Sequence, residues 1–149
     1  METVLAVLHV LSAVFLVGPM AILPMTAMRV LRAGDRRQVG GLAKSTEVFS
    51  FASLAAVVFG FGVMGMSDPK YDLSITTPWI LISLVLYLVA LGLNLGMVVP
   101  AMQAAGRDAN AAQAAQVSGK PAGYSRIAMG SGLVSLLLVI VVILMVWKP

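Results

Sequence analysis

The amino-acid sequence predicts an all-α membrane protein, a four-transmembrane-helix bundle with both termini outside the cytoplasm. Of its 149 residues, 60% are hydrophobic and 11% are charged, which makes it more apolar than a soluble domain of this length. Four apolar segments are each long enough to cross a bilayer. The basic residues gather in two of the three segments between them, as the positive-inside rule requires of cytoplasmic loops.

The four apolar segments set the expected spans. A helix needs about 20 apolar residues to cross a hydrocarbon layer of about 30 Å. We expect spans over residues 3–28, 48–66, 78–102 and 127–147, in a single domain that covers residues 1–149. The first is predicted to be a retained span, because Glu2 leads it and its apolar run is longer than that of a signal peptide.

Three residues predict an irregularity in the first span. They are Gly18, Pro19 and Pro24, and a proline inside a helix removes a backbone hydrogen bond. We expect a kink there. The kink is either a simple bend, which membrane helices tolerate, or the edge of a possible cavity or partner groove.

The segments 29–47 and 103–126 are predicted to be cytoplasmic loops of a multi-pass protein of the cell (inner or plasma) membrane. They hold eight of the ten basic residues, namely Arg29, Arg32, Arg36, Arg37, Lys44, Arg107, Lys120 and Arg126. Trp79 and Trp147, with Tyr71, would form an aromatic belt at the outer interface, and Tyr124 would lie at the inner one. Arg29, Arg32, Arg36 and Arg37 also form a candidate site for anionic lipid headgroups.

Two polar side chains inside the spans are candidates for chemistry. His9 lies about 10 Å from the outer end of the first span, where a neutral imidazole could bind haem or a metal. The alternative is a structural histidine that bonds to Ser12 or to a neighbouring carbonyl. Asn94, in the third span, is expected to bond to another helix or, alternatively, to contact a substrate.

Small residues recur at helical spacing and predict close helix packing. In lipid, such residues let backbones approach and supply much of the association energy. They predict a tight bundle or a docking face for a partner. The residues are Ala52, Ala56, Gly60, Gly92, Gly96, Ala128 and Gly132.

The sequence lacks the motifs of the common catalytic sites. It has no cysteine, no HExxH, no P-loop and no GxGxxG motif. We therefore expect no enzyme activity, no catalytic residue, no nucleic-acid partner and no cofactor, apart from the haem or metal alternative at His9. The Ala- and Gln-rich segment 103–126 is expected to extend the third helix, to break near Gly119 and Pro121, and to form a contact arm.

One segment carries a resemblance to known families. In LHVLSAVFLVGPMAILP, Leu8 to Pro24, a Leu-His pair is followed nine residues later by Gly18. This resembles the opening helix of an uncharacterised family of small four-span bacterial membrane proteins. More distantly it is similar to the CopD and HemJ membrane families, which implies haem or copper at His9. The sequence departs from the HemJ-like pattern at Phe15, near an expected Trp, and has no second-span His.

The Cys-free composition, rich in Ala, Val and Gly, looks like that of an actinobacterial membrane protein. That resemblance implies an accessory subunit of a larger envelope assembly, such as an Mce-type lipid-import complex. Our preferred hypothesis is a non-enzymatic accessory or structural subunit, with membrane lipids and other membrane protein subunits as partners. The alternatives are a haem- or metal-binding protein that uses His9, and a small transporter or homo-oligomeric channel.

Overall fold

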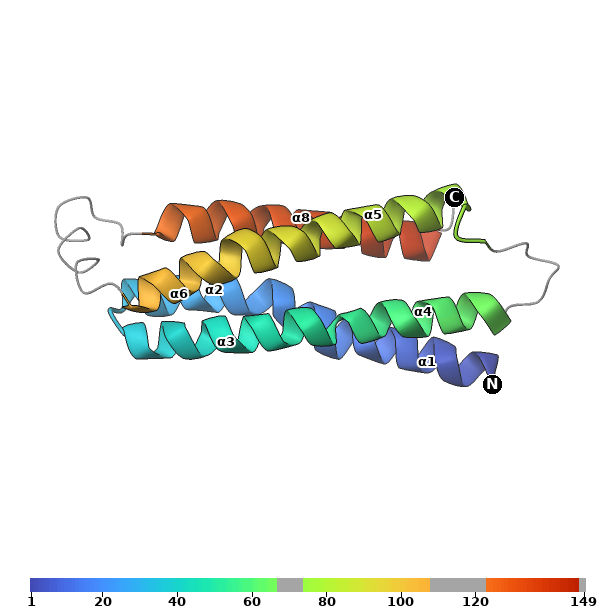
Figure 1. Ribbon diagram of the computed structural model, residues 1–149, viewed down its shortest axis with the longest axis horizontal. Helices are drawn as coiled ribbons and strands as arrows, with labels where there is room; N and C mark the ends of the chain where they lie inside the picture. Colours follow the sequence, from blue (N-terminus) through green and yellow to red (C-terminus); the bar gives the residue numbers. More distant parts are fainter. Residues whose placement is uncertain (67–73, 108–122, 148–149) are drawn as a thin grey trace.

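The computed structural model describes residues 1–66, 74–107 and 123–147, and over these residues it confirms the all-α class and the four spans. Four long helices in this part of the chain are apolar enough to cross a membrane: Glu2–Arg32, Arg36–Met66, Pro78–Arg107 and Tyr124–Trp147. They lie side by side along one axis, with both termini at the same end (Figure 1). We call that end the terminal end, and the end with residues 33–35 the turn end.

Local changes in hydrogen bonding divide three of the four helices. The first helix consists of α1 (Glu2–Ser12), a π-helical turn η1 (Ala13–Val17) and α2 (Gly18–Arg32). The second consists of α3 (Arg36–Ala52) and α4 (Leu54–Met66), and the third of α5 (Pro78–Leu93), a π-helical turn η3 (Asn94–Val98) and α6 (Val99–Arg107). The fourth is the single helix α8 (Tyr124–Trp147).

The helices run past the ends of the predicted spans. Residues 29–47, expected as a loop, are helical except for the turn at 33–35, and the third helix continues from 102 to Arg107. With about 1.5 Å per residue, the 31 residues of the first helix extend about 46 Å, well beyond a hydrocarbon layer of about 30 Å. The charged residues therefore mark where the helices leave the hydrocarbon, and the helices themselves end later. The break near Gly119 and Pro121 lies outside the described residues.

The turn between α2 and α3 has a clear local cause. Gly34 takes a φ of +83°, a left-handed conformation that favours glycine, and the amide of Asp35 bonds back to the carbonyl of Val30 at 3.3 Å. The Asp35 side chain then accepts the Gln38 amide at 3.1 Å and caps the start of α3. These contacts reverse the chain within three residues.

Each π-helical turn is separated from a following proline by one residue. The amides of Gly18 and Val99 bond to the carbonyls of Ala13 and Asn94, five residues back, and Pro19 and Pro100 follow. A proline ring clashes with the carbonyl four residues earlier, and a π turn widens the helix at that point. The expected irregularity at Gly18, Pro19 and Pro24 is therefore a π turn at Ala13–Val17, whereas Pro24 is buried inside α2.

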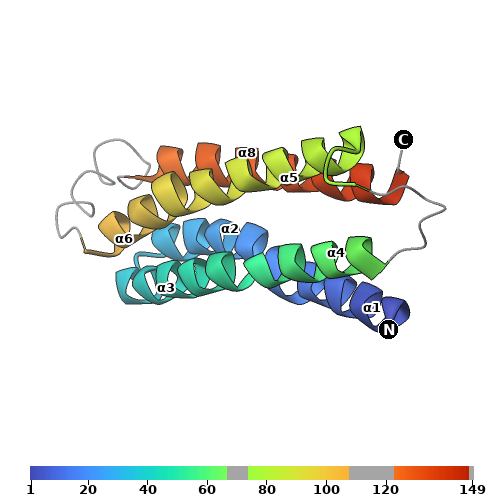
Figure 2. The same ribbon diagram turned by 45° about the vertical axis from the view of Figure 1, so that its right-hand side comes forward.

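All four helices pack against one another only toward the turn end. There α2 contacts α3 and α8, and α3 contacts α6. Toward the terminal end α1 packs on α4, and α5 packs on α8, but the two pairs have no comparable contact with each other. The views in Figures 1 and 2 agree on this separation. Burial agrees too, since Ser12 is the one buried residue of α1 and Ala56 that of α4.

Two glycines allow the close approach at the turn end. A Cβ on Gly106 of α6 would lie 3.1 Å from the Gly40 amide nitrogen and 3.3 Å from the Arg36 carbonyl on α3. A Cβ on Gly130 of α8 would lie 2.7 Å from Cγ2 of Val98, which is fully buried. Neither position tolerates a larger residue without movement of its neighbour.

We predict that Gly130→Ala destabilises the bundle by about 1–3 kcal/mol, because the added methyl group overpacks against the stiff Val98 side chain. The control is Gly132→Ala on the same helix, where a Cβ meets no atom within 4 Å. Unfolding in detergent micelles, followed by circular dichroism, measures both. Adding Val98→Ala should restore much of the loss, and equal stability of the two glycine variants would contradict the packing described.

Candidate functional site

His9 is held between the first two helices. Its Nδ1 lies 2.7 Å from the carbonyl oxygen of Ala56 on α4, and a carbonyl only accepts, so Nδ1 carries the proton. A Cβ on Gly60 would lie 3.0 Å from Cε1 of the ring, so the glycine makes room for the imidazole. Of the two partners considered from the sequence, Ser12 and a carbonyl, the ring contacts a carbonyl, and Ser12 donates to the carbonyl of Leu8 at 2.7 Å.

The amide of Asn94 joins the second and third helices. Asn94 is fully buried, and its Nδ2 donates to Oγ of Ser50 at 2.7 Å. Ser50 in turn donates to the carbonyl of Thr46 at 2.7 Å on its own helix. The contact is a bond to another helix, the first of the two roles considered for Asn94.

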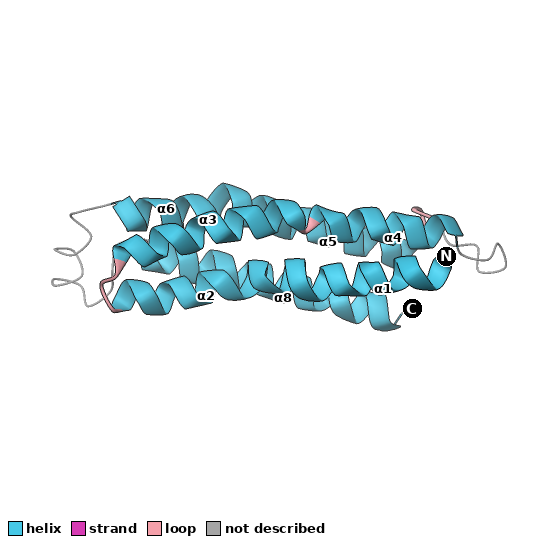
Figure 3. Cartoon of the chain, turned by 90° about the horizontal axis from the view of Figure 1, so that it is seen from below, coloured by secondary structure: helices cyan, strands magenta, loops and turns pink. Residues whose placement is uncertain are grey.

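A second hydrogen bond joins the same two helices near Asn94. The Tyr87 and Ser53 hydroxyl oxygens lie 2.6 Å apart, and because Ser53 donates to the Ser50 carbonyl at 2.7 Å, Tyr87 is the donor. Ser53 also lies at the break between α3 and α4 (pink in Figure 3). Hydroxyl groups that bond back to helix carbonyls bend helices, which accounts for the break. We call Ser50, Ser53, Tyr87 and Asn94 the polar cluster.

Some buried oxygens of the described residues have no hydrogen-bond partner. They are Oδ1 of Asn94 and the hydroxyl oxygens of Ser83 and Ser135. A buried acceptor without a partner costs free energy, about 1–3 kcal/mol for a neutral group. The polar cluster thus holds the helices together while Asn94 keeps one acceptor unused.

The small residues predicted to pack divide into two groups. Gly60 contacts His9, Ala56 is buried, and Ala52 is half-buried in the second helix. By contrast Gly92, Gly96 and Gly132 are exposed, and a Cβ on any of them meets no atom within 4 Å. Gly92 and Gly96 therefore face away from the other helices, whereas Gly132 and the half-buried Ala128 border the open groove between α2 and α8.

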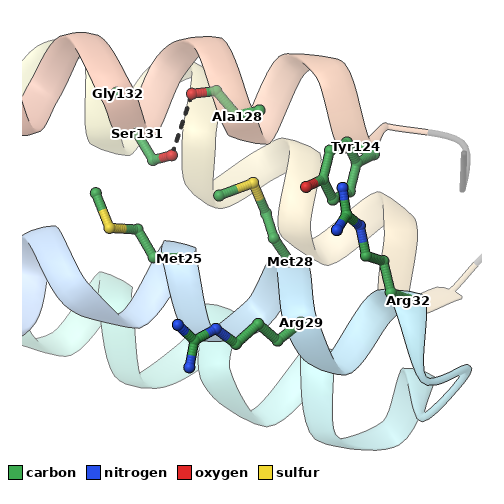
Figure 4. A pocket seen from close by; sticks show the side chains of 8 residues that line it. All are labelled: Met25, Met28, Arg29, Arg32, Tyr124, Ala128, Ser131 and Gly132. Atoms are coloured by element: carbon green, nitrogen blue, oxygen red, sulfur yellow. Dashed lines mark hydrogen bonds between the residues drawn. The ribbon is translucent and has the colours of Figure 1, made fainter.

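A basic groove lies between α2 and α8 at the turn end (Figure 4). It has a volume of about 320 Å³ and is lined by Met25, Met28, Arg29, Arg32, Tyr124, Ala128, Ser131 and Gly132. The Arg32 guanidinium carbon lies 4.6 Å from the centre of the Tyr124 ring. Arg36 and Arg37, grouped with these arginines by sequence, begin α3 and do not line the groove. This groove is also not lined by Gly18, Pro19 or Pro24, beside which the sequence left a cavity or partner groove as one alternative.

Metal-binding groups are sparse in the described part of the chain. No three His, Cys, Asp or Glu side chains come together there. The one candidate ligand is Nε2 of His9, which carries the free lone pair once Nδ1 is protonated. Histidines that ligate metals commonly donate their other N–H to a carbonyl, as His9 does.

The sequence comparison settles the family. Residues 3–149 match the family described as predicted integral membrane protein (DUF2269). The chain belongs to this family. Searches of curated proteins and of solved structures gave no match. Membership agrees with the expected uncharacterised membrane family and with a multi-pass membrane protein. The likeness to CopD and HemJ, the actinobacterial origin and the cytoplasmic side of the loops stay predictions.

Most of the polar cluster was not predicted from the sequence. Asn94 was selected because amides are rare inside spans, whereas Ser50, Ser53 and Tyr87 are ordinary residues of membrane helices. A pattern was nevertheless present, since Thr46, Ser50 and Ser53 follow one another at helical spacing and Tyr87 lies seven residues before Asn94. Polar residues at such spacing on facing helices indicate a shared interface.

We predict a measurable coupling between Asn94 and Ser50. In a double-mutant cycle with Asn94→Ala and Ser50→Ala, the coupling free energy should be about 0.6 kcal/mol, the average for membrane helix hydrogen bonds. The matched control pairs Asn94→Ala with Ser83→Ala, because Ser83 is buried and has no bond to Asn94. Reversible unfolding in mixed micelles measures both cycles, and a coupling no larger than the control would refute the bond.

Proposed function

We propose that this protein is a non-enzymatic accessory subunit that docks another membrane protein on the third helix. The observation that carries the proposal is the outward face of Gly92 and Gly96, where a Cβ would meet no atom within 4 Å. Glycines four residues apart let a second helix approach a backbone closely, which supplies association energy in lipid. Leu88, half exposed one turn earlier, continues the same face.

The separation of the helix pairs at the terminal end supports the proposal. There α1 with α4 and α5 with α8 form two pairs without the mutual packing of the turn end. A partner helix that docks on α5 would complete the packing of that half. The Mce-type lipid importers were suggested by composition alone. The proposed partner is therefore a membrane-embedded complex in general, rather than one particular assembly.

The test is co-purification in mild detergent from the native membrane. We expect Gly92→Leu to release a membrane protein that remains with the parent, because the leucine side chain blocks close approach. Gly65→Leu is the matched control, since its site on α4 is also open and lies on another helix. A photo-crosslinker at Leu88 should give an adduct with the same protein. A lone homo-oligomer, or equal release by both variants, would overturn the proposal.

Haem or metal binding at His9 is the second candidate function, and one observation favours it. The hydrogen bond from Nδ1 to Ala56 fixes the tautomer and leaves Nε2 as an unprotonated nitrogen, the form that ligates iron or copper. With one histidine in the chain, a second protein ligand would come from Met or from a partner.

The absorption spectrum tests this second candidate. If His9 holds haem, the protein purified from its native membrane shows a Soret band that His9→Ala removes. If His9 holds a metal ion, metal analysis by mass spectrometry shows iron or copper in the parent. Asn94→Ala serves as the control, because it removes a buried polar group that does not contact His9. A colourless, metal-free parent ends the candidate.

A further inference from the structure

The basic groove between α2 and α8 combines charged and apolar surface, and its residues are not part of the docking face proposed above. The Arg32 guanidinium lies at one end of the groove beside Tyr124, whereas the Arg29 guanidinium extends along α2 away from that of Arg32 (Figure 4). Met25, Ala128 and Gly132 line the remainder. The lining includes no carboxylate. In the described residues neither arginine forms an ion pair, and the ion pair of Lys44 with Glu47 lies on α3.

Arg32 is held in place by an aromatic ring. Its guanidinium lies 4.6 Å from the centre of Tyr124, a cation–π contact between α2 and α8 (Figure 4). Arg29 lies one turn earlier on the same helix and also lines the groove, although its guanidinium points away from that of Arg32 (Figure 4). Because Arg32 is already ordered, a ligand that binds there loses less conformational entropy. Guanidinium groups bind phosphate through paired hydrogen bonds, so the groove suits a phosphate group.

The lining of the groove changes from apolar to charged side chains along the membrane normal. Seven residues separate Met25 from Arg32, which is about 10 Å along the helix axis. The 24 residues from Tyr124 to Trp147 extend about 36 Å, which places these aromatic residues near opposite interfaces. The arginines therefore lie at headgroup depth, while Met25 and Gly132 lie within the hydrocarbon.

The size of the groove limits what it holds. A volume of about 320 Å³ is at the lower end of the range for ligand pockets, about 300–1,000 Å³. It accommodates a phosphate headgroup with the first carbons of an acyl chain, and the remaining chain would lie in the bilayer. Free phosphate would use the arginines but leave the apolar surface uncovered.

We propose that this groove binds one anionic phospholipid, with its phosphate at the Arg32 guanidinium and its acyl chain along Gly132. Gly132 is suited to that role, because a Cβ there meets no atom within 4 Å and the surface of α8 is left open. Neither Gly92 nor Gly96, which form the proposed docking face, lines this groove.

Native mass spectrometry of the detergent-solubilised full chain tests the proposal with phosphatidylglycerol and phosphatidylcholine as probes. We expect the parent to retain one phosphatidylglycerol, and Arg29→Gln with Arg32→Gln to weaken that binding roughly 30-fold, from about 1 kcal/mol per arginine. Gly132→Leu should also weaken it, although both arginines remain. An excess of inorganic phosphate should not displace the lipid, because it lacks the acyl chain.

Two matched variants control for general effects. Arg37→Gln with Arg126→Gln removes the same charge from exposed positions outside the groove, and Gly65→Leu on α4 adds the same side chain to another open glycine. Both should bind phosphatidylglycerol as the parent does. Equal loss with the control arginines would show general charge attraction and overturn the site. Equal retention of phosphatidylcholine, or no effect of Gly132→Leu, would overturn it as well.

Discussion

The hydrogen bonds of the polar cluster tie the two halves of the bundle together. Asn94 and Tyr87, on the third helix, bond to Ser50 and Ser53 on the second, in a region where lipid offers no alternative partner. These bonds lie between the two regimes of packing. Toward the turn end the helices approach closely at Gly106 and Gly130, and toward the terminal end they continue as two pairs.

Each pair at the terminal end has its own contacts. In the first, the hydrogen bond from His9 to the Ala56 carbonyl and the ring contact with Gly60 join α1 to α4. In the second, α5 packs on α8. A bundle built in this way has one half that is complete by itself. The other half carries the unusual histidine and adjoins the exposed face of Gly92, the features on which both proposed functions depend.

The sequence was sufficient to predict the class and the number of spans, because hydropathy measures what a lipid environment requires. It expected the third helix to continue past residue 102, as it does to Arg107, but it misplaced the helix ends in residues 29–47. Charges such as Arg32 and Lys44 mark the water boundary there, while backbone hydrogen bonding continues past it. The sequence did not predict the π turns, although Pro19, which follows the first of them, was noted. Helical spacing selected glycines without showing which way they face, so Gly106 and Gly130 were missed. The same limit left Arg29 and Arg32 grouped with Arg36 and Arg37.

The central claim is that the bundle is firmly packed at the turn end and forms two separate pairs at the terminal end. Distances between paired spin labels in lipid nanodiscs test it most directly, since the chain has no cysteine of its own. Labels at Gly41 and Ala104, exposed on α3 and α6, should give a narrow distance distribution. Labels at Phe61 and Leu81, exposed on α4 and α5, should give a broad one. Equally narrow distributions from both pairs would contradict the account.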